Sequence, residues 1–167
     1  MIDVHVLTHS GTKPEWLDQC LESLAAEPCT VHVVQGVERN IAAGREMGFG
    51  LGTHPFVTFV DSDDYVLPGA MEAMCEALQG NDAAVGRERM LVDGQLSPGT
   101  VGGHHLYALR RSVLASHLPG WGERNKGIHC IYALHAVAPP VAVDCVTYVW
   151  RRHAEQSNRR MYQWRPQ

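Results

Sequence analysis

The chain has 167 residues, of which 45% are hydrophobic and 19% are charged. These values fit one globular domain with a real core, and they exclude a disordered or fibrous chain. No apolar run approaches the roughly 20 residues that a membrane helix needs. The first residues have neither the basic start nor the cleavage site of a signal peptide. We therefore expect one cytoplasmic domain over residues 1–167.

The net charge of −4 hides an asymmetry between the two halves of the chain. Residues 1–100 hold 5 Lys and Arg against 15 Asp and Glu, whereas residues 101–167 hold 9 against 3. An acidic half is suited to a cation, and a basic half to a phosphorylated or polyanionic group. Accidental surface composition explains the asymmetry equally well. The five cysteines are odd in number and lack Cys-x-x-Cys spacing, so neither a disulfide framework nor a zinc knuckle is indicated.

Hydrophobic patterns predict three strand–helix units in the first 80 residues. The expected strands are 2–8, 30–34 and 56–60, and the expected helices run from Pro14 towards Pro28, over 38–50, and from Pro68 to Gly80. Thr12 and Glu15 have the spacing of a capping box at the first helix. Alternating strands and helices predict an α/β fold, with a mostly parallel central sheet and flanking helices.

The second half of the chain has weaker signals. Short strands are expected at 83–86, 89–92 and 141–149, a strand followed by a helical turn within 105–114, a helix at 128–137, and loops at 94–103 and 119–127. A basic tail follows from Arg151 and carries Tyr162 and Trp164. The pair His104-His105 is not expected to bind zinc, because adjacent residues in a strand point to opposite faces.

Polar residues follow each of the first three expected strands. They are Thr8, His9 and Ser10 after the first, Gln35 after the second, and Asp61 to Asp64 after the third. In parallel sheets the carboxyl ends of the strands form the ligand-binding edge, so these loops are expected to converge. Three neighbouring carboxylates repel one another, and a hard cation such as Mg²⁺ or Mn²⁺ relieves that repulsion. For an isolated Asp-x-Asp, a polar turn before a helix is the alternative interpretation.

The context of this cluster resembles the GT-A fold of the inverting family 2 glycosyltransferases. The stretch from Phe56 to Leu78 resembles the family's strand, its Asp-Ser-Asp-Asp turn and its following helix. Residues 43–48 resemble its Ala-x-Arg-Asn-x-Gly segment, with Glu46 where Asn is usual. Residues 148–157 resemble its closing Tyr-x-x-Arg-x-His-x-x-x-Ser motif. The two strongest motifs lie about 90 residues apart, which makes the resemblance far more specific than Asp-x-Asp alone.

The resemblance implies transfer of a sugar from a nucleotide-diphospho-sugar, most often a UDP-sugar, with inversion and with Mn²⁺ or Mg²⁺. It places Asp61 at the ribose and the metal, Asp63 on the metal, and His153 as the C-terminal metal ligand. Residues 1–80 would form the nucleotide-sugar-binding half, and 81–167 the acceptor-side half. The nucleotide-sugar site would comprise Thr8, His9, Ser10, Gln35, Arg45, Asp61 and Ser62, with Gln35 replacing a more usual Asp.

The catalytic base is the point where the sequence departs from the family. Family 2 enzymes use an Asp at the start of a helix, and the corresponding residues here are Gly127, Ile128 and His129. Three interpretations remain open: His129 acts as the base, Glu123 reaches in from the loop, or the chain has lost the activity. Histidine has an unperturbed pKa near 6.5, which suits a base at neutral pH.

Two other classes of function compete with sugar transfer. A nucleotide-sugar-binding module without turnover would keep the same site. Phosphoryl or nucleotidyl transfer would normally bring a glycine-rich phosphate loop, which is not seen near Thr8 or Asp61. The expected acceptor is a glycan or a lipid-linked sugar. A modified base in DNA is a third possibility, because the basic tail suits phosphates and base stacking.

Overall fold

The computed structural model describes residues 1–98, 105–126 and 130–153. The strands are β1 (Ile2–Thr8), β2 (Cys29–Gln35), β3 (Phe56–Asp61), β4 (Tyr65–Val66), β5 (Ala83–Val92), β6 (Gln95–Leu96), β7 (Tyr107–Arg110) and β8 (Val141–Arg152). The helices are α1 (Pro14–Ala25), α2 (Ile41–Phe49), α3 (Ala70–Ala77), α4 (Arg111–Ala115), α5 (Trp121–Arg124) and α6 (Cys130–Val137). Among these helices, none has the length and apolar character needed to cross a membrane.

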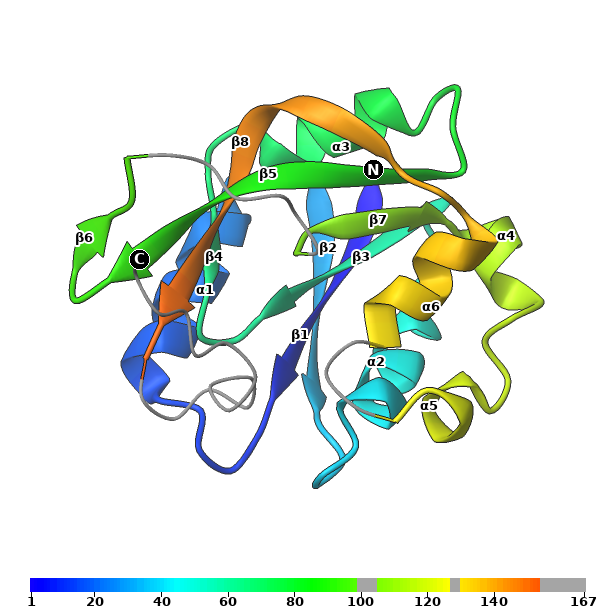
Figure 1. Ribbon diagram of the computed structural model, residues 1–167, viewed down its shortest axis with the longest axis horizontal. Coiled ribbons are helices and arrows are strands. Elements are labelled where there is room, and N and C mark those ends of the chain that lie inside the picture. Colours follow the sequence, from blue (N-terminus) through cyan, green and yellow to red (C-terminus); the bar gives the residue numbers. More distant parts are fainter. Residues whose placement is uncertain (99–104, 127–129, 154–167) are drawn as a thin grey trace, which may run out of the picture.

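Within the described residues, one eight-stranded sheet runs through both halves of the chain (Figure 1). Its order is β2-β1-β3-β7-β5-β8-β4, and β6 pairs with β5. The three long ladders, β1 with β2, β1 with β3 and β5 with β8, are parallel. The antiparallel pairings are short, and β7 lies antiparallel between β3 and β5. The α/β fold with flanking helices is therefore confirmed, and the sheet is mixed around a parallel framework.

Two hydrophobic cores cover the two faces of the sheet. Alternate residues of a strand point to opposite faces, so β3, β5 and β7 contribute to both cores. One core joins β1 to α1 and α3 through buried residues that include Ile2, Val4, Leu24, Met71 and Met74. The other joins β3 and β7 to α2, α4, α5 and α6 through buried residues that include Val57, Phe59, Phe49, Trp121 and Leu134. The first three strand–helix units are confirmed, and both faces of the sheet are covered.

Four local predictions were wrong. The loop expected at 94–103 contains the short strand β6 (Gln95–Leu96). The strands expected at 83–86 and 89–92 are one strand, β5, whose register shifts on either side of Arg87. The loop expected at 119–127 contains the short helix α5. The capping box of α1 does not form: Lys13 is the N-cap and makes no side-chain cap bond. The Thr12 hydroxyl instead lies 3.1 Å from that of Ser62, so it serves the loop that carries the aspartates.

A buried ion-pair network centred on Asp3 lies at the edge of the sheet opposite the loops that follow β1, β2 and β3. Asp3, 1% exposed, lies 2.7 Å from the Arg111 guanidinium, 2.9 Å from the His32 imidazole and 2.7 Å from the His54 amide. Arg111 also donates to three backbone carbonyls, those of Phe49, Leu51 and His54. Burial by itself would raise the pKa of Asp3, but these hydrogen bonds and the nearby guanidinium outweigh it and hold that pKa below its usual value.

We predict that Arg111→Ala lowers the free energy of unfolding by about 3 kcal/mol, because it leaves the Asp3 carboxylate buried without its cation. Since the folded-state pKa of Asp3 is depressed, its stabilisation is present above pH ~4 and fades as the pH falls further. The difference between parent and variant should therefore shrink in acid. Urea unfolding at pH 7 and pH 3 measures both effects.

Arg87→Ala is the control, because Arg87 forms an exposed pair with Asp144. It should cost at most about 1 kcal/mol. An equal loss in the two variants would contradict the importance of the buried network.

Candidate functional site

The loops after β1, β2 and β3 converge at one edge of the sheet, as the sequence predicts. Thr8 is in register with Gln35 across the β1–β2 ladder, and Leu7 with Asp61 across β1–β3. The Thr8 hydroxyl donates to the Val34 carbonyl at 3.2 Å. Thr8 is buried, whereas Gln35 is exposed. His9 and Ser10 are also exposed, so this edge combines the buried Thr8 with side chains that a ligand can reach.

Arg45, on α2, holds the first aspartate. Its Nη2 lies 2.6 Å from Asp61 Oδ1, and its guanidinium stacks 3.6 Å from the Phe59 ring centroid. The side chain is only 5% exposed, and its Nε and Nη1 have no hydrogen-bond partner among the described residues. Burying polar donors without partners costs free energy. The unused donors therefore mark a place where an anionic ligand would be stabilised.

Close packing of α2 on β1 fixes the distance of Arg45 from the sheet. A Cβ atom on Gly48 would lie 2.4 Å from Cγ of His5, so only glycine lets the helix approach this ring. His5 is fully buried against Phe49 and Phe59. Burial, followed by the charge of Arg45, places the pKa of His5 well below its usual value, so this imidazole is a neutral wall behind the guanidinium.

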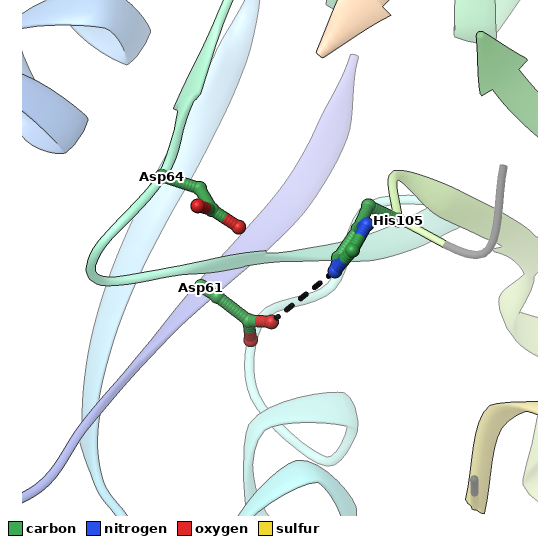
Figure 2. A group of neighbouring side chains, drawn as sticks. All are labelled: Asp61, Asp64 and His105. Atoms are coloured by element: carbon green, nitrogen blue, oxygen red, sulfur yellow. Dashed lines mark ion pairs between the residues drawn. The ribbon is translucent and has the colours of Figure 1, made fainter. Parts of the chain in front are cut away.

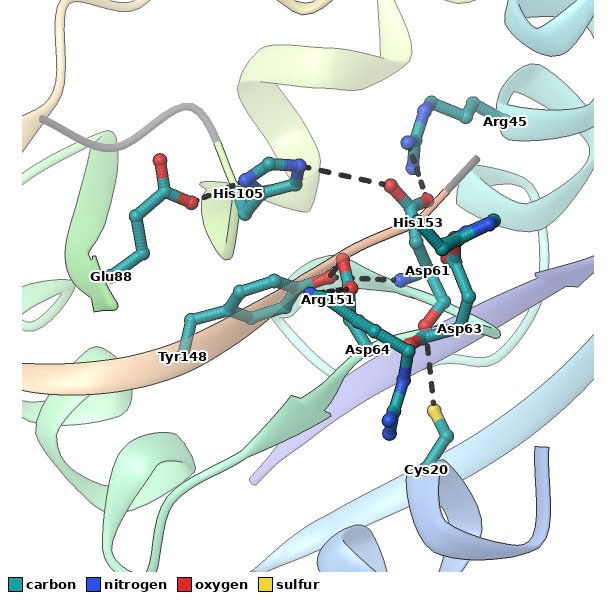
Figure 3. Close-up of polar contacts among 10 residues, drawn as sticks. All are labelled: Cys20, Arg45, Asp61, Asp63, Asp64, Glu88, His105, Tyr148, Arg151 and His153. Atoms are coloured by element: carbon teal, nitrogen blue, oxygen red, sulfur yellow. Dashed lines mark hydrogen bonds and ion pairs between the residues drawn. The ribbon is translucent and has the colours of Figure 1, made fainter. Parts of the chain in front are cut away.

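Asp64 connects the aspartate turn to β8 in the C-terminal half of the chain. Its Oδ2 accepts a hydrogen bond from the Tyr148 hydroxyl at 2.7 Å, and its Oδ1 accepts one from the Arg151 amide at 2.6 Å (Figure 3). The Tyr148 hydroxyl in turn accepts from the Asp61 amide at 3.2 Å. Burial, and then the charges of Asp63 and Asp61, raise the pKa of Asp64 well above its usual value. This carboxyl group therefore joins β8 to the aspartate turn.

Asp63, in the turn after β3, contacts His153, which directly follows β8. His153 Nε2 lies 2.7 Å from Asp63 Oδ2, although the two residues are 90 positions apart in sequence. The imidazole also packs on Trp16, with ring centroids 4.5 Å apart. Arg151 Nε donates to the Asp63 carbonyl at 2.8 Å, which holds the turn and β8 together. Two side chains that the sequence assigned to one cation therefore point at one another.

His105 is a site residue that the sequence analysis missed. It is 4% exposed, stacks on the Tyr148 ring at 5.0 Å, and directs Nε2 towards Asp61 Oδ2 at 4.0 Å (Figure 2). Its Nδ1 is bonded to the buried carboxylate of Glu88 on β5. The rule that strand neighbours alternate faces does not apply, because Leu106 has a left-handed backbone (φ 50°) and β7 begins only at Tyr107.

Glu46 has a defined role in place of the asparagine usual in the family 2 segment. Its two carboxylate oxygens accept the amides of Gly120 and Gly122 at 2.8 and 2.7 Å. A Cβ atom on Gly122 would lie 2.5 Å from the Ala43 Cα, so α5 packs directly on α2. The longer acidic side chain reaches α5 and holds its first turn in place.

Of the two candidates for the base, Glu123 lies in α5 and His129 lies outside the described residues. Asn40 Nδ2 donates to Glu123 Oε1 at 3.1 Å, and Lys126 Nζ lies 2.7 Å from Oε2. The Glu123 side chain is 68% exposed. It is therefore positioned by two partners and accessible to solvent. The tail arginines Arg159 and Arg160, with Tyr162 and Trp164, also lie outside the described residues.

The arrangement is suited to a hard cation and an anion together. Carboxylates and imidazoles are ligands for Mn²⁺, and carboxylates for Mg²⁺. Asp63 Oδ2 and His153 Nε2 already lie within the distance that separates two ligands of one ion. The buried donors of Arg45 lie beside Asp61 and suit a phosphate group. The residues present therefore fit a cation–diphosphate ligand.

Comparison with known proteins agrees with this geometry. Residues 6–98 match the family described as Glycosyl transferase family 2. The crystal structure of S. aureus TarS 1-349 has a TM-score of 0.67 at 16% identity, covering 90% of this chain and 60% of that one. Its complex with UDP-GlcNAc has a TM-score of 0.67 at 14% identity, covering 93% and 59%. Its complex with UDP has a TM-score of 0.66 at 17% identity, covering 90% and 60%.

This chain thus spans about 60% of the length of those TarS chains, and at these identities the likeness shows a shared GT-A fold. No curated protein matches the sequence.

We predict that Tyr148→Phe lowers the free energy of unfolding by about 1–3 kcal/mol. The variant leaves the Asp61 amide and one oxygen of Asp64 without the hydroxyl between them. Urea unfolding measures the loss. Tyr65→Phe, on the adjacent β4, is the matched control for removal of a hydroxyl and should change stability much less. Equal stability of Tyr148→Phe and the parent would show that the hydroxyl does not hold β8 to the turn.

Proposed function

The chain belongs to glycosyltransferase family 2, and we propose that it moves a sugar from a nucleotide-diphospho-sugar to an acceptor in a metal-dependent, inverting reaction. The observation that carries the proposal is the contact between Asp63 and His153. The turn after β3 and the end of β8 bring these two side chains to 2.7 Å. The expected metal-binding positions of the Asp-x-Asp and Tyr-x-x-Arg-x-His motifs thus meet at one point.

Different residues of the site would bind different parts of the nucleotide-sugar donor and its metal. Asp63 and His153 would hold Mn²⁺ or Mg²⁺, with Asp61 organising the metal and contacting the ribose. The ion would supply positive charge that stabilises the departing diphosphate. Arg45 has two buried donors for the nucleotide part. We place the nucleobase against the buried Thr8 and the exposed His9, Ser10 and Gln35. The Ser62 hydroxyl is held by that of Thr12.

Uridine is the nucleoside that we propose for the donor. TarS, which shares the fold, has been solved in complexes with UDP-GlcNAc and with UDP. The acceptor that we propose is a glycan or a lipid-linked sugar, and a modified base in DNA is the alternative. The competing function for the same site is that of a nucleotide-sugar-binding module, which binds the donor without turning it over.

We predict that Mn²⁺ and UDP together raise the melting temperature more than the sum of the two ligands added separately. Saturation to about 100 times the dissociation constant stabilises by roughly 2.7 kcal/mol, or about 5–10 °C for a chain of this size. Asp63→Ala should reduce the synergy strongly while leaving the unliganded fold intact, because it removes one of three mutually repelling carboxylates. Thermal shift, with and without Mn²⁺, measures it.

Asp144→Ala is the control, since Asp144 is an exposed carboxylate on β8 paired with Arg87. It should keep the full synergy. An Asp63→Ala protein that binds Mn²⁺ and UDP as well as the parent would overturn the site assignment.

We further predict that the base is either Glu123 or His129. Inverting transfer needs a group that takes the proton of the acceptor, which contributes roughly 100- to 10,000-fold to the rate. Glu123→Gln and His129→Ala are assayed separately for UDP binding and for turnover of UDP-, GDP- and dTDP-sugars. One variant should lose turnover by about 100-fold or more with its binding unchanged.

Normal turnover in both variants would exclude both residues. A parent protein that binds but never turns over would support the binding module.

A further inference from the structure

His105 and Glu88 form a buried imidazole–carboxylate pair that the family motifs do not include. Both residues are almost completely buried, at 4% and 1% exposure. Glu88 occupies Nδ1 of the imidazole, and stacking on Tyr148 at an interplanar angle of 5° fixes the plane of the ring. Both constraints leave Nε2 directed at the Asp61 carboxylate (Figures 2 and 3).

The separation of His105 from Asp61 is too long for a hydrogen bond and suits an ion between the two. His105 Nε2 and Asp61 Oδ2 are 4.0 Å apart, whereas N–H···O bonds are about 2.7–3.2 Å long. An ion halfway along the line would be about 2.0 Å from each atom, which is the length of a metal–imidazole or Mg²⁺–oxygen bond. Ligand atoms of Asp61, Asp64 and His105 all lie within 4.8 Å of one another.

The surroundings of the two side chains match those of metal ligands. A histidine that binds a metal usually gives its second ring nitrogen to a carboxylate, which fixes the tautomer and the ring. Glu88 stands in that position. Asp61 divides its oxygens in the same way: Oδ1 accepts from Arg45, and Oδ2 faces His105.

Arg45 gives independent evidence for a ligand at this place. Its Nε and Nη1 are buried without partners in the part of the chain that the structure describes, and its Nη2 is bonded to Asp61. The oxygens of a second anion would satisfy these unused donors with charge-assisted hydrogen bonds. A cation on Oδ2 of Asp61 and a diphosphate within reach of Arg45 would satisfy both sides of the same carboxylate.

We propose that Asp61 and His105 hold a divalent cation of their own, beside the Asp63–His153 pair, with Glu88 as the residue that orients the imidazole. Asp63 and His153 do not belong to the group of mutually close ligand atoms, so the two places are distinct. The proposal rests on the proposed function in one respect: the anion that accompanies this ion is the diphosphate of the donor. Two cations would then share the negative charge of the leaving group.

Pulsed electron paramagnetic resonance of Mn²⁺, with UDP present, tests this site without an activity assay. Coupling of Mn²⁺ to an imidazole nitrogen reports a bound histidine. His153→Ala should keep an imidazole coupling, which comes from His105, and the double variant His105→Ala/His153→Ala should lose it. Glu88→Gln should weaken Mn²⁺ binding about 10- to 100-fold by releasing the ring. His117→Ala, which changes an exposed histidine, is the control and should behave as the parent.

The outcomes separate this inference from the proposed function. If the parent shows an imidazole coupling and His153→Ala shows none, only the Asp63–His153 site binds metal and the His105 site is wrong. If His153→Ala and Asp63→Ala bind Mn²⁺ as the parent does but His105→Ala does not, the His105 site stands and the Asp63–His153 assignment fails. Absence of Mn²⁺ binding in the parent overturns both. Since His153→Ala retains His105, a folding defect of His105→Ala does not affect the decisive measurement.

Discussion

The active-site edge depends on the buried carboxyl group of Asp64. A carboxyl group that is 1% exposed needs hydrogen bonds to offset the loss of water, and Asp64 receives them from the Tyr148 hydroxyl and the Arg151 amide. Both donors belong to β8, more than 80 residues later in the chain. Because β8 is bound to Asp64 at two points, the position of the residues that follow it is fixed. His153 arrives at Asp63 as a consequence.

The three aspartates have separate partners, and this explains how their carboxylates can lie so close together. Asp61 is paired with Arg45, Asp63 with His153, and Asp64 with β8. Burial, followed by the charges of Asp63 and Asp61, still raises the pKa of Asp64 above its usual value, so some repulsion among the carboxylates remains. A cation bound by the proposed ligands would meet oxygens already directed inward, and its binding would need little rearrangement of the backbone. Preorganised ligands of this kind bind more tightly than ones that must first be collected.

Much of the N-terminal half could be predicted from local patterns. Apolar runs followed by polar loops located β1 to β3, and the clustered aspartates identified the site within that framework. His105 could not be found in this way, since its direction depends on the left-handed backbone of Leu106, a buried leucine in a conformation that sequence patterns do not predict. Glu88 was equally hidden, because it sits where the register of β5 and β8 shifts. A bulge changes which side chains face inward, and periodicity alone cannot locate it.

Glu46, which replaces the asparagine usual in this segment, ties α2 to α5. Arg45 and Glu46 are neighbours on α2, so their side chains leave the helix in different directions. Arg45 points to Asp61, and Glu46 holds the first turn of α5. Asn40 is the N-cap of the same helix. Its Oδ1 accepts a hydrogen bond from the Ala43 amide, and its Nδ2 donates one to Glu123. A shift of α2 would therefore move the Arg45 guanidinium and the Glu123 carboxylate together, so both candidate groups are held by one helix.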